Sequence, residues 1–93
     1  MGYTLKKFFG YLAWYAEQTP KFKAQIEKRM SNIELYGHLG HIRDLKDGLF
    51  EIKFNNGARV YFARTGPKEI TLLLGGDKHG QSQDIAKAKK LIC

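Results

Sequence analysis

The sequence predicts an α+β domain in which a small sheet is backed by a helical hairpin and followed by a C-terminal helix. Apolar and charged residues alternate over residues 49–54 and again over 59–64, as expected of two half-buried strands. Apolar residues recur at helical spacing between 21 and 36. The predicted order along the 93 residues is β-α-α-β-β-β-α without repeats or linkers, so we expect one domain spanning 1–93.

The N-terminal elements are predicted as a short strand over residues 3–8 and a helix over 9–17. Tyr3 and Leu5 are expected to face the core, because alternate residues of a strand share a face. Around Trp14, the residues predicted to form the apolar side of the helix are Leu12, Tyr15 and Ala16.

The second helix is the clearest element of the sequence. Thr19 is a suitable cap and Pro20 suits the first turn, so the helix is expected to occupy residues 21–36. Its predicted apolar stripe consists of Phe22, Ile26, Met30 and Ile33. The aromatic residues expected to pack the two helices together are Tyr11, Trp14, Tyr15 and Phe22.

The second half of the chain predicts most of the sheet. Residues 41–45 are a candidate short strand, and Asn55-Asn56-Gly57 can reverse the chain between the two alternating strands. Residues 69–74 are nearly all apolar, as in a central strand covered on both faces. A glycine-rich turn over residues 75–80 then leads into a final helix over about 82–92.

The hairpin would carry an apolar face and a polar face. The apolar face consists of Phe50, Ile52, Phe54, Val60 and Phe62, and the polar face of Glu51, Lys53, Arg59 and Tyr61. Arg59 and Lys53 could bind a phosphate, with Glu51 as a general base. The alternative is cross-strand charge pairing on a solvated face, which is common in antiparallel sheets. The residues alone leave both interpretations open.

The turn after the last strand is a second candidate for chemistry. Gly75 and Gly76 would let the backbone turn sharply and approach a ligand, with Lys78 and His79 at the rim of the sheet. Histidine titrates near neutral pH, so His79 is a candidate acid or base. The alternative is an idle surface histidine.

The composition favours a polyanionic partner. Sixteen Lys and Arg against nine Asp and Glu give a net charge of +7, which makes nucleic acid the first candidate. The candidate RNA-binding residues are Arg43, Lys46, Tyr61, Lys87 and Lys89, and a solvated surface is the alternative. The single cysteine, Cys93, excludes an intramolecular disulfide, and we expect no metal or other cofactor. The apolar runs are too short to span a membrane, so we expect a cytoplasmic protein.

Four segments resemble the addiction-module killer proteins, which form the HigB-like branch of the RelE/ParE toxin superfamily. These segments are GLFEIK at 48–53, GARVYF at 57–62, LLLGGDK at 72–78 and QDIAKA at 83–88. The resemblance implies a small twisted antiparallel sheet packed against an N-terminal helical hairpin, a fold shared with microbial ribonucleases. It also implies the toxin of a bacterial type II toxin–antitoxin pair.

The RNase members of this superfamily imply a role for several residues. They cut mRNA in the ribosomal A site by metal-independent attack of the ribose 2′-OH on the adjacent phosphate. Arg59 matches the arginine that grips the scissile phosphate, Lys53 matches a basic residue of the same site, and Glu51 falls where others hold a second basic residue. Lys78 and His79 fall near the C-terminal acid–base region.

The resemblance also implies partners and leaves alternatives. The expected partners are a helix-turn-helix antitoxin of the HigA type, in a hetero-oligomer, and mRNA on the ribosome. Gln81 and Ile85 stand where RelE has a C-terminal arginine and tyrosine, so the general acid stays open among His79, Lys78 and Tyr61. ParE members inhibit DNA gyrase on the same fold, and a non-catalytic nucleic-acid-binding module is a third possibility.

Overall fold

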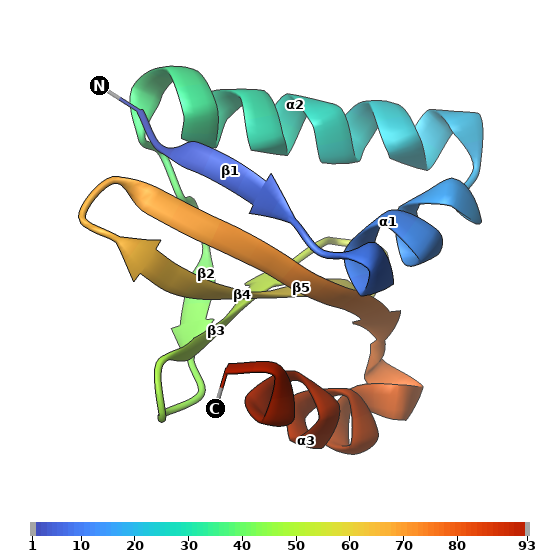
Figure 1. Cartoon of the computed structure of the whole chain (residues 1–93). Helices are drawn as coiled ribbons and strands as arrows, with labels where there is room; N and C mark the ends of the chain where they lie inside the picture. The colour runs from blue at the N-terminus through green and yellow to red at the C-terminus, as the bar shows by residue number, and fades with distance from the viewer. Residues whose placement is uncertain (1, 93) are drawn as a thin grey trace.

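The computed structural model describes residues 2–92 and contains a five-stranded sheet with helices on both faces (Figure 1). The elements in chain order are β1 (Thr4–Lys7), α1 (Phe9–Ala16), α2 (Pro20–Tyr36), β2 (Ile42–Asp44), β3 (Leu49–Lys53), β4 (Ala58–Gly66), β5 (Glu69–Asp77), the 3-10 helix η1 (Lys78–Gly80) and α3 (Gln81–Ile92). The predicted α+β class is confirmed, and the candidate strand near residues 41–45 is present as β2. Cys93 lies outside the described residues.

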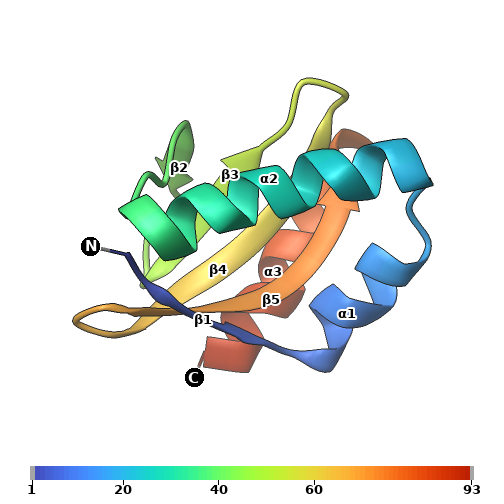
Figure 2. The same cartoon turned by 90° about the horizontal axis from the view of Figure 1, so that it is seen from above.

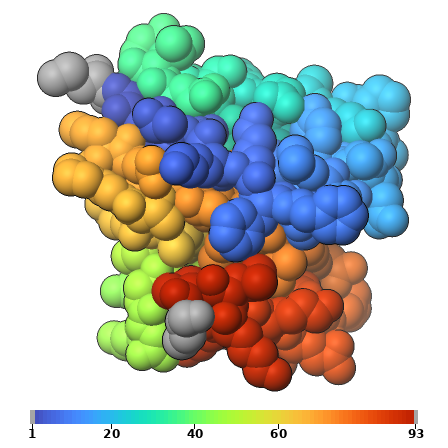
Figure 3. Space-filling model, in the orientation of Figure 1, coloured from blue at the N-terminus to red at the C-terminus, as the bar shows by residue number. Residues whose placement is uncertain are grey.

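The helices form two layers, one on each side of the sheet. α1 and α2 cover one face, and α3 covers the other (Figures 1 and 2). The strand order is β1-β5-β4-β3-β2. All neighbours are antiparallel except β1, which runs parallel to β5, so the sheet is mixed rather than wholly antiparallel. In the space-filling view, side chains of α1, in blue, adjoin those of α3, in red (Figure 3).

The apolar side of α1 differs from the prediction. Tyr11 is buried, whereas Leu12 is 46% exposed and Ala16 is also exposed. The reason is a close approach of α1 to β5. A Cβ at Gly10 would lie 2.5 Å from Cδ2 of Leu74, so the side of α1 that carries Gly10 must face the strand. The predicted packing of aromatic residues is confirmed, because the rings of Tyr11, Trp14, Tyr15 and Phe22 form a chain of contacts with centroids about 6 Å apart.

α2 matches its sequence pattern closely. The hydroxyl of Thr19 accepts a hydrogen bond from the backbone N–H of Phe22 at 3.1 Å, and Pro20 opens the first turn. The helix ends at Gly37, whose φ of 71° is in the left-handed region that favours glycine. All four residues of the predicted stripe are buried, and they pack with the apolar face of the hairpin as one core cluster.

The hairpin of β3 and β4 has the predicted turn and the predicted two faces. Phe50 lies opposite Phe62, Glu51 opposite Tyr61 and Lys53 opposite Arg59. The polar face is not solvated, however, because α3 covers it: a second core cluster joins sheet residues to α3 and consists of Leu49, Tyr61, Ala63, Leu73 and Ala88. Three of the four residues of the predicted polar face are buried, and the fourth, Lys53, is exposed.

The glycine pair at 75–76 forms part of a strand and not the predicted turn. Gly75 pairs with Val60, and Gly76 pairs with Arg59. A Cβ at Gly75 would lie 2.0 Å from Cδ2 of Trp14, and one at Gly76 would lie 2.1 Å from Oδ2 of Asp84. Both glycines therefore allow helices to approach β5 closely. None of the helices within residues 2–92 is both long and apolar enough to span a bilayer.

Candidate active site

The candidate active site lies between the sheet and α3, on the polar face of the hairpin. Glu51 and Tyr61 face each other across β3 and β4, and Arg59 stands two residues from Tyr61 on the same face. Their exposed fractions are 2% for Glu51, 0% for Tyr61 and 8% for Arg59. The sheet therefore brings these three predicted residues together, in an interior position rather than on an open surface.

Glu51 is the centre of the cluster, because its carboxylate is contacted from three elements. Oε2 accepts a hydrogen bond from the Gln81 amide at 2.7 Å and lies 3.7 Å from Nε of Arg59. Oε1 lies 3.6 Å from Nε of Arg43 on β2. A buried carboxylate requires such partners, since an unpaired charge in the interior is costly. Glu51 thus orients two guanidinium groups and ties α3 to the sheet.

Arg59 retains unused hydrogen-bonding capacity. Its Nε and Nη1 atoms are buried and have no hydrogen-bond partner among the described residues; the Nε contact to Glu51 is an ion pair without a hydrogen bond. A guanidinium carries five N–H donors in a fork that matches phosphate oxygens. These two donors are enclosed, so an anion would have to enter the space under α3 to complete their hydrogen bonding.

Tyr61 is also buried without a partner for its hydroxyl within the described residues. Burial raises the pKa of Tyr61 to about 12, with smaller contributions from the Glu51 and Asp84 carboxylates. The phenol is therefore neutral at physiological pH and can donate a proton or a hydrogen bond. Burial also raises the pKa of Asp84, whose carboxylate sits in the space left by Gly76.

Lys53, Lys78 and His79 lie at one end of this face. Lys53 ends β3 opposite Arg59, and Arg59 pairs on its other side with Gly76, just before η1. Within η1, Asp77 Oδ1 accepts hydrogen bonds from the backbone N–H groups of His79 and Gly80, so the loop is ordered while the Lys78 and His79 side chains stay exposed. These three residues are thus neighbours of the Arg59 end of the sheet.

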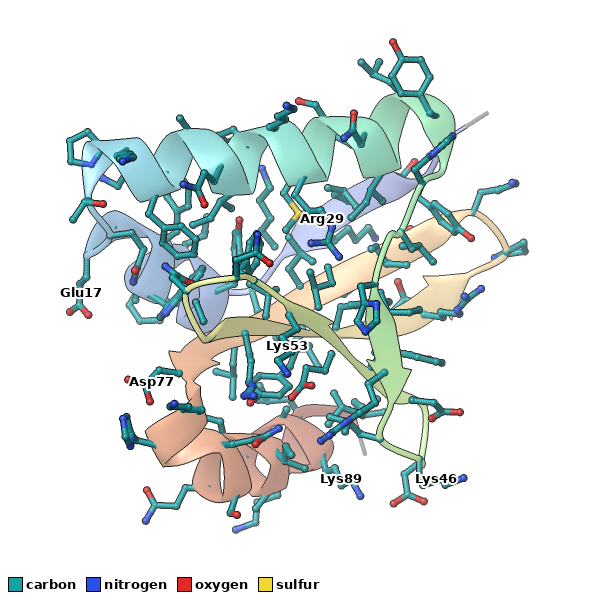
Figure 4. All side chains as sticks on the ribbon, turned by 180° about the vertical axis from the view of Figure 1, so that it is seen from behind. Glu17, Arg29, Lys46, Lys53, Asp77 and Lys89 are labelled. Carbon is teal, nitrogen blue, oxygen red and sulfur yellow. The ribbon has the colours of Figure 1, made fainter. Side chains whose placement is uncertain are left out.

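The remaining predicted RNA-binding residues are spread more widely. Arg43 joins the cluster through Glu51. Lys89 lies near Lys46, away from Asp77 (Figure 4), and forms an ion pair with Asp47 at 3.3 Å. Lys87 is exposed on α3. The structure therefore groups Arg43 with the candidate site and separates Lys46 and Lys89 from it.

Sequence reasoning missed two residues of the cluster, Gln81 and Asp84. Both come from α3: Gln81 reaches Glu51 of the hairpin and Asp84 reaches Gly76 of β5 only when the chain folds back, so no local pattern indicates them. Across residues 2–92, no three His, Cys, Asp or Glu side chains are grouped closely enough to hold a metal ion.

Comparison with known proteins gives one sequence relative and several structural ones. No protein-family model matches the chain. A curated protein of Haemophilus influenzae, described as uncharacterized, is 38% identical over 71 residues, which cover 74% of this chain and 71% of that protein.

Solved structures with a similar fold include E. coli RelE proteins. A mutant of the E. coli toxin RelE in the free state aligns over 100% of both chains with a TM-score of 0.78 and 16% identity. The isolated E. coli RelE toxin aligns over 92% of this chain and 98% of that chain, with a TM-score of 0.67 and 13% identity. A chain of the intact E. coli RelBE toxin–antitoxin complex aligns over 82% of this chain and 96% of that chain, with a TM-score of 0.63 and 14% identity. At these identities the likeness establishes the fold.

Proposed function

From the RelE fold and the residues gathered around Arg59, we propose that this chain, which belongs to the same protein family as the Haemophilus influenzae relative, is a toxin that cleaves mRNA. It would be the toxin of a bacterial type II pair, of the HigB-like branch. The observation that carries the proposal is the buried Arg59–Glu51 pair, with Lys53, Lys78 and His79 at the same end of the sheet. This set contains the cations and the proton-transfer groups that phosphodiester cleavage requires.

The proposed reaction needs no group beyond these side chains. The ribose 2′-oxygen bonds to the adjacent phosphorus, and the bond from phosphorus to the 5′-oxygen breaks. Arg59 is proposed to stabilise the negative charge that develops on the phosphate, and Lys53 adds a second cation. DNA lacks the 2′-OH and cannot follow this route.

Two protons must move during this reaction. Glu51 is the proposed base for the 2′-OH proton: the Gln81 amide occupies Oε2, which leaves Oε1 to accept that proton. The proposed acids for the 5′-oxygen are His79 and Lys78 at the rim, with Tyr61 as the buried alternative. The neutral, unpartnered phenol of Tyr61 supports its inclusion.

The proposed partners follow from the fold and the charge. We propose an antitoxin of the helix-turn-helix, HigA-like type, and the RelBE toxin–antitoxin complex among the structural neighbours supports a hetero-oligomer of this kind. The proposed substrate is mRNA on the ribosome in the cytoplasm. The net charge of +7 supports binding to RNA, with Arg43, Lys46, Lys87 and Lys89 as candidate contacts.

Inducible expression in bacteria tests this function. The wild-type chain is expected to arrest growth, and Arg59→Ala is expected to relieve the arrest, since removing the phosphate ligand should slow cleavage by about a hundredfold or more. Arg64→Ala is the matched control, because Arg64 lies exposed on the same strand and its loss changes the net charge equally. Transcript ends mapped in a translation reaction, with and without ribosomes, would locate the cuts.

Protein amount and folding must be equal for the two variants. Glu51 keeps Arg43 and Gln81 as partners when Arg59 is removed, so Arg59→Ala is expected to fold. Arrest by Arg59→Ala as strong as that by the wild type would contradict the site. Intact transcripts together with blocked DNA supercoiling would contradict the RNase proposal and indicate a gyrase inhibitor.

A further inference from the structure

A groove runs from the candidate active site, around the end of β3, to α2. It consists of three adjoining pockets of about 130, 420 and 270 Å³. Lys53 lines all three pockets, His41 lines the first two, and Phe54 and Asn55 line the second and third. The α2 residues in the third pocket are Gln25, Lys28, Arg29 and Asn32.

Glu51 lines the first pocket of the groove and pairs with Arg43, but three other cations of the groove have no carboxylate partner within residues 2–92. Among the described residues, Lys28, Arg29 and Lys53 form no ion pair, whereas Arg43 and Arg59 both pair with Glu51. Cations that lack a partner within the fold are free to interact with an anion.

Arg29 fixes the shape of the groove. Its Nη2 donates to the carbonyl oxygens of Leu39 at 3.2 Å and His41 at 3.0 Å, and its Nη1 donates to that of Lys53 at 3.4 Å. Figure 4 shows Arg29 between α2 and the strand that carries Lys53. A Cβ at Gly40 would lie 2.9 Å from Nη2 of Arg29, so glycine at this position of the loop before β2 makes room for the guanidinium. The partners are neutral carbonyl groups, so the charge of Arg29 remains.

We propose that this groove binds single-stranded RNA on one side of the phosphate held at Arg59. Lys28, Arg29 and Lys53 would contact successive phosphates, and the exposed imidazole of His41 could stack on a base. The side-chain amides of Gln25, Asn32 and Asn55 can hydrogen-bond to base edges or sugars. The inference rests on the proposed function for the position of the scissile phosphate.

The character of the groove favours RNA over a protein segment. Its aromatic residue, Phe54, is 7% exposed and therefore offers no apolar anchor. Protein interfaces usually depend on such anchors in desolvated pockets, whereas RNA contacts are mostly polar and charged. Lys53, which lines all three pockets of the groove, also lies opposite Arg59.

Anisotropy with a labelled 2′-O-methyl RNA tests the groove without cleavage, because this probe has no free 2′-OH. Oligomers of about twelve and about three nucleotides separate the groove from the site alone. Lys28→Glu is expected to weaken binding of the longer oligomer by about tenfold and to reduce its salt dependence, with a change below about twofold for the shorter one. Lys7→Glu is the matched control, because it changes the net charge equally but lies on β1, at the opposite edge of the sheet. It is expected to change the affinity for either oligomer by no more than about twofold.

The outcomes separate this proposal from the proposed function. Equal binding by Lys28→Glu and Lys7→Glu would overturn the groove even if the wild-type chain cleaves mRNA. Selective weakening by Lys28→Glu would support the groove even if the wild-type chain cleaved nothing. Unchanged RNA binding together with weaker binding of the antitoxin would assign the groove to a protein partner and overturn the RNA proposal.

Discussion

The carboxylate of Glu51 contacts residues from β2, β4 and α3, although its own exposed fraction is 2%. Each contact offsets part of the cost of burying the charge, and the loss of one partner leaves two others. Arg59 is less completely satisfied, since Nη1 has no hydrogen-bond partner among the described residues. The imbalance between a satisfied carboxylate and an unsatisfied guanidinium supports the proposal that Arg59 stabilises an anion.

Tyr61→Phe tests the buried phenol. At neutral pH the variant is expected to be as stable as the wild type or slightly more so, because it removes a buried hydroxyl without a partner. The pKa of Tyr61 is raised from 10.0 to about 12 in the fold, so wild-type stability is complete below pH 10 and is lost as the pH rises toward 12. The difference in favour of Phe should reach about 1 kcal/mol near pH 11.

Urea unfolding of both proteins between about pH 8 and pH 11 measures this difference. Other groups titrate in the same range, but they are common to the two proteins and cancel in the comparison. A difference in unfolding free energy that stays constant over the range would contradict the assigned environment of Tyr61.

At the residue scale, the sequence predicts neighbours within the hairpin and fails beyond it. Alternation and the Asn55-Asn56-Gly57 turn set the register that places Glu51, Tyr61 and Arg59 on one face. Gln81 is thirty positions from Glu51, and its contact depends on where α3 docks. No property of Gln81 itself indicates that contact.

Among the elements, α1 and β5 approach closely at two glycines. Gly10 of α1 lies against Leu74 of β5, and Gly75 of β5 lies against Trp14 of α1. A Cβ at Gly10 would lie 2.5 Å from Cδ2 of Leu74, and one at Gly75 would overlap the Trp14 indole. The approach is closer than side chains would allow, and it turns Tyr11 rather than Leu12 toward the core. Helical spacing alone could not distinguish these two orientations, because both residues are apolar and adjacent.

Gly75→Ala tests this close approach. The added Cβ would lie 2.0 Å from Cδ2 of Trp14, so the indole and α1 must move. We expect a loss of about 1–3 kcal/mol of unfolding free energy and a changed Trp14 fluorescence spectrum. Gly80→Ala is the matched control, because its Cβ would meet Asp84 at an ordinary 3.4 Å. Equal stability of the two variants in thermal unfolding would contradict the packing.

α3 shows why the character of the hairpin's second face could not be predicted. Within α3, Ala88 is fully buried and the neighbouring lysines stay exposed or half-buried. A short, basic helix with a small buried side is also compatible with a solvated surface helix. The polar face of the hairpin is equally compatible with solvent, so neither pattern taken alone predicts that the two surfaces bury each other.

The molecule as a whole has two apolar clusters that share one sheet. Val60 and Phe62 of β4 belong to the cluster under α1 and α2, whereas Tyr61 and Ala63 belong to the cluster under α3. Alternate residues of a single strand therefore support both layers. We expect the two layers to unfold together, because displacing β4 would remove buried residues from both clusters at once.

Leu73→Ala tests this cooperativity from the α3 side. Leu73 is 2% exposed in the α3 cluster, so its truncation should cost about 2–5 kcal/mol. Trp14 lies in the opposite layer, on α1, and packs against the other cluster. In urea unfolding, far-UV circular dichroism and Trp14 fluorescence are expected to shift together to a lower midpoint, since two-state unfolding gives coincident transitions. An unshifted fluorescence transition, with an early loss of ellipticity, would instead mean that α3 and its cluster open independently of the α1–α2 layer.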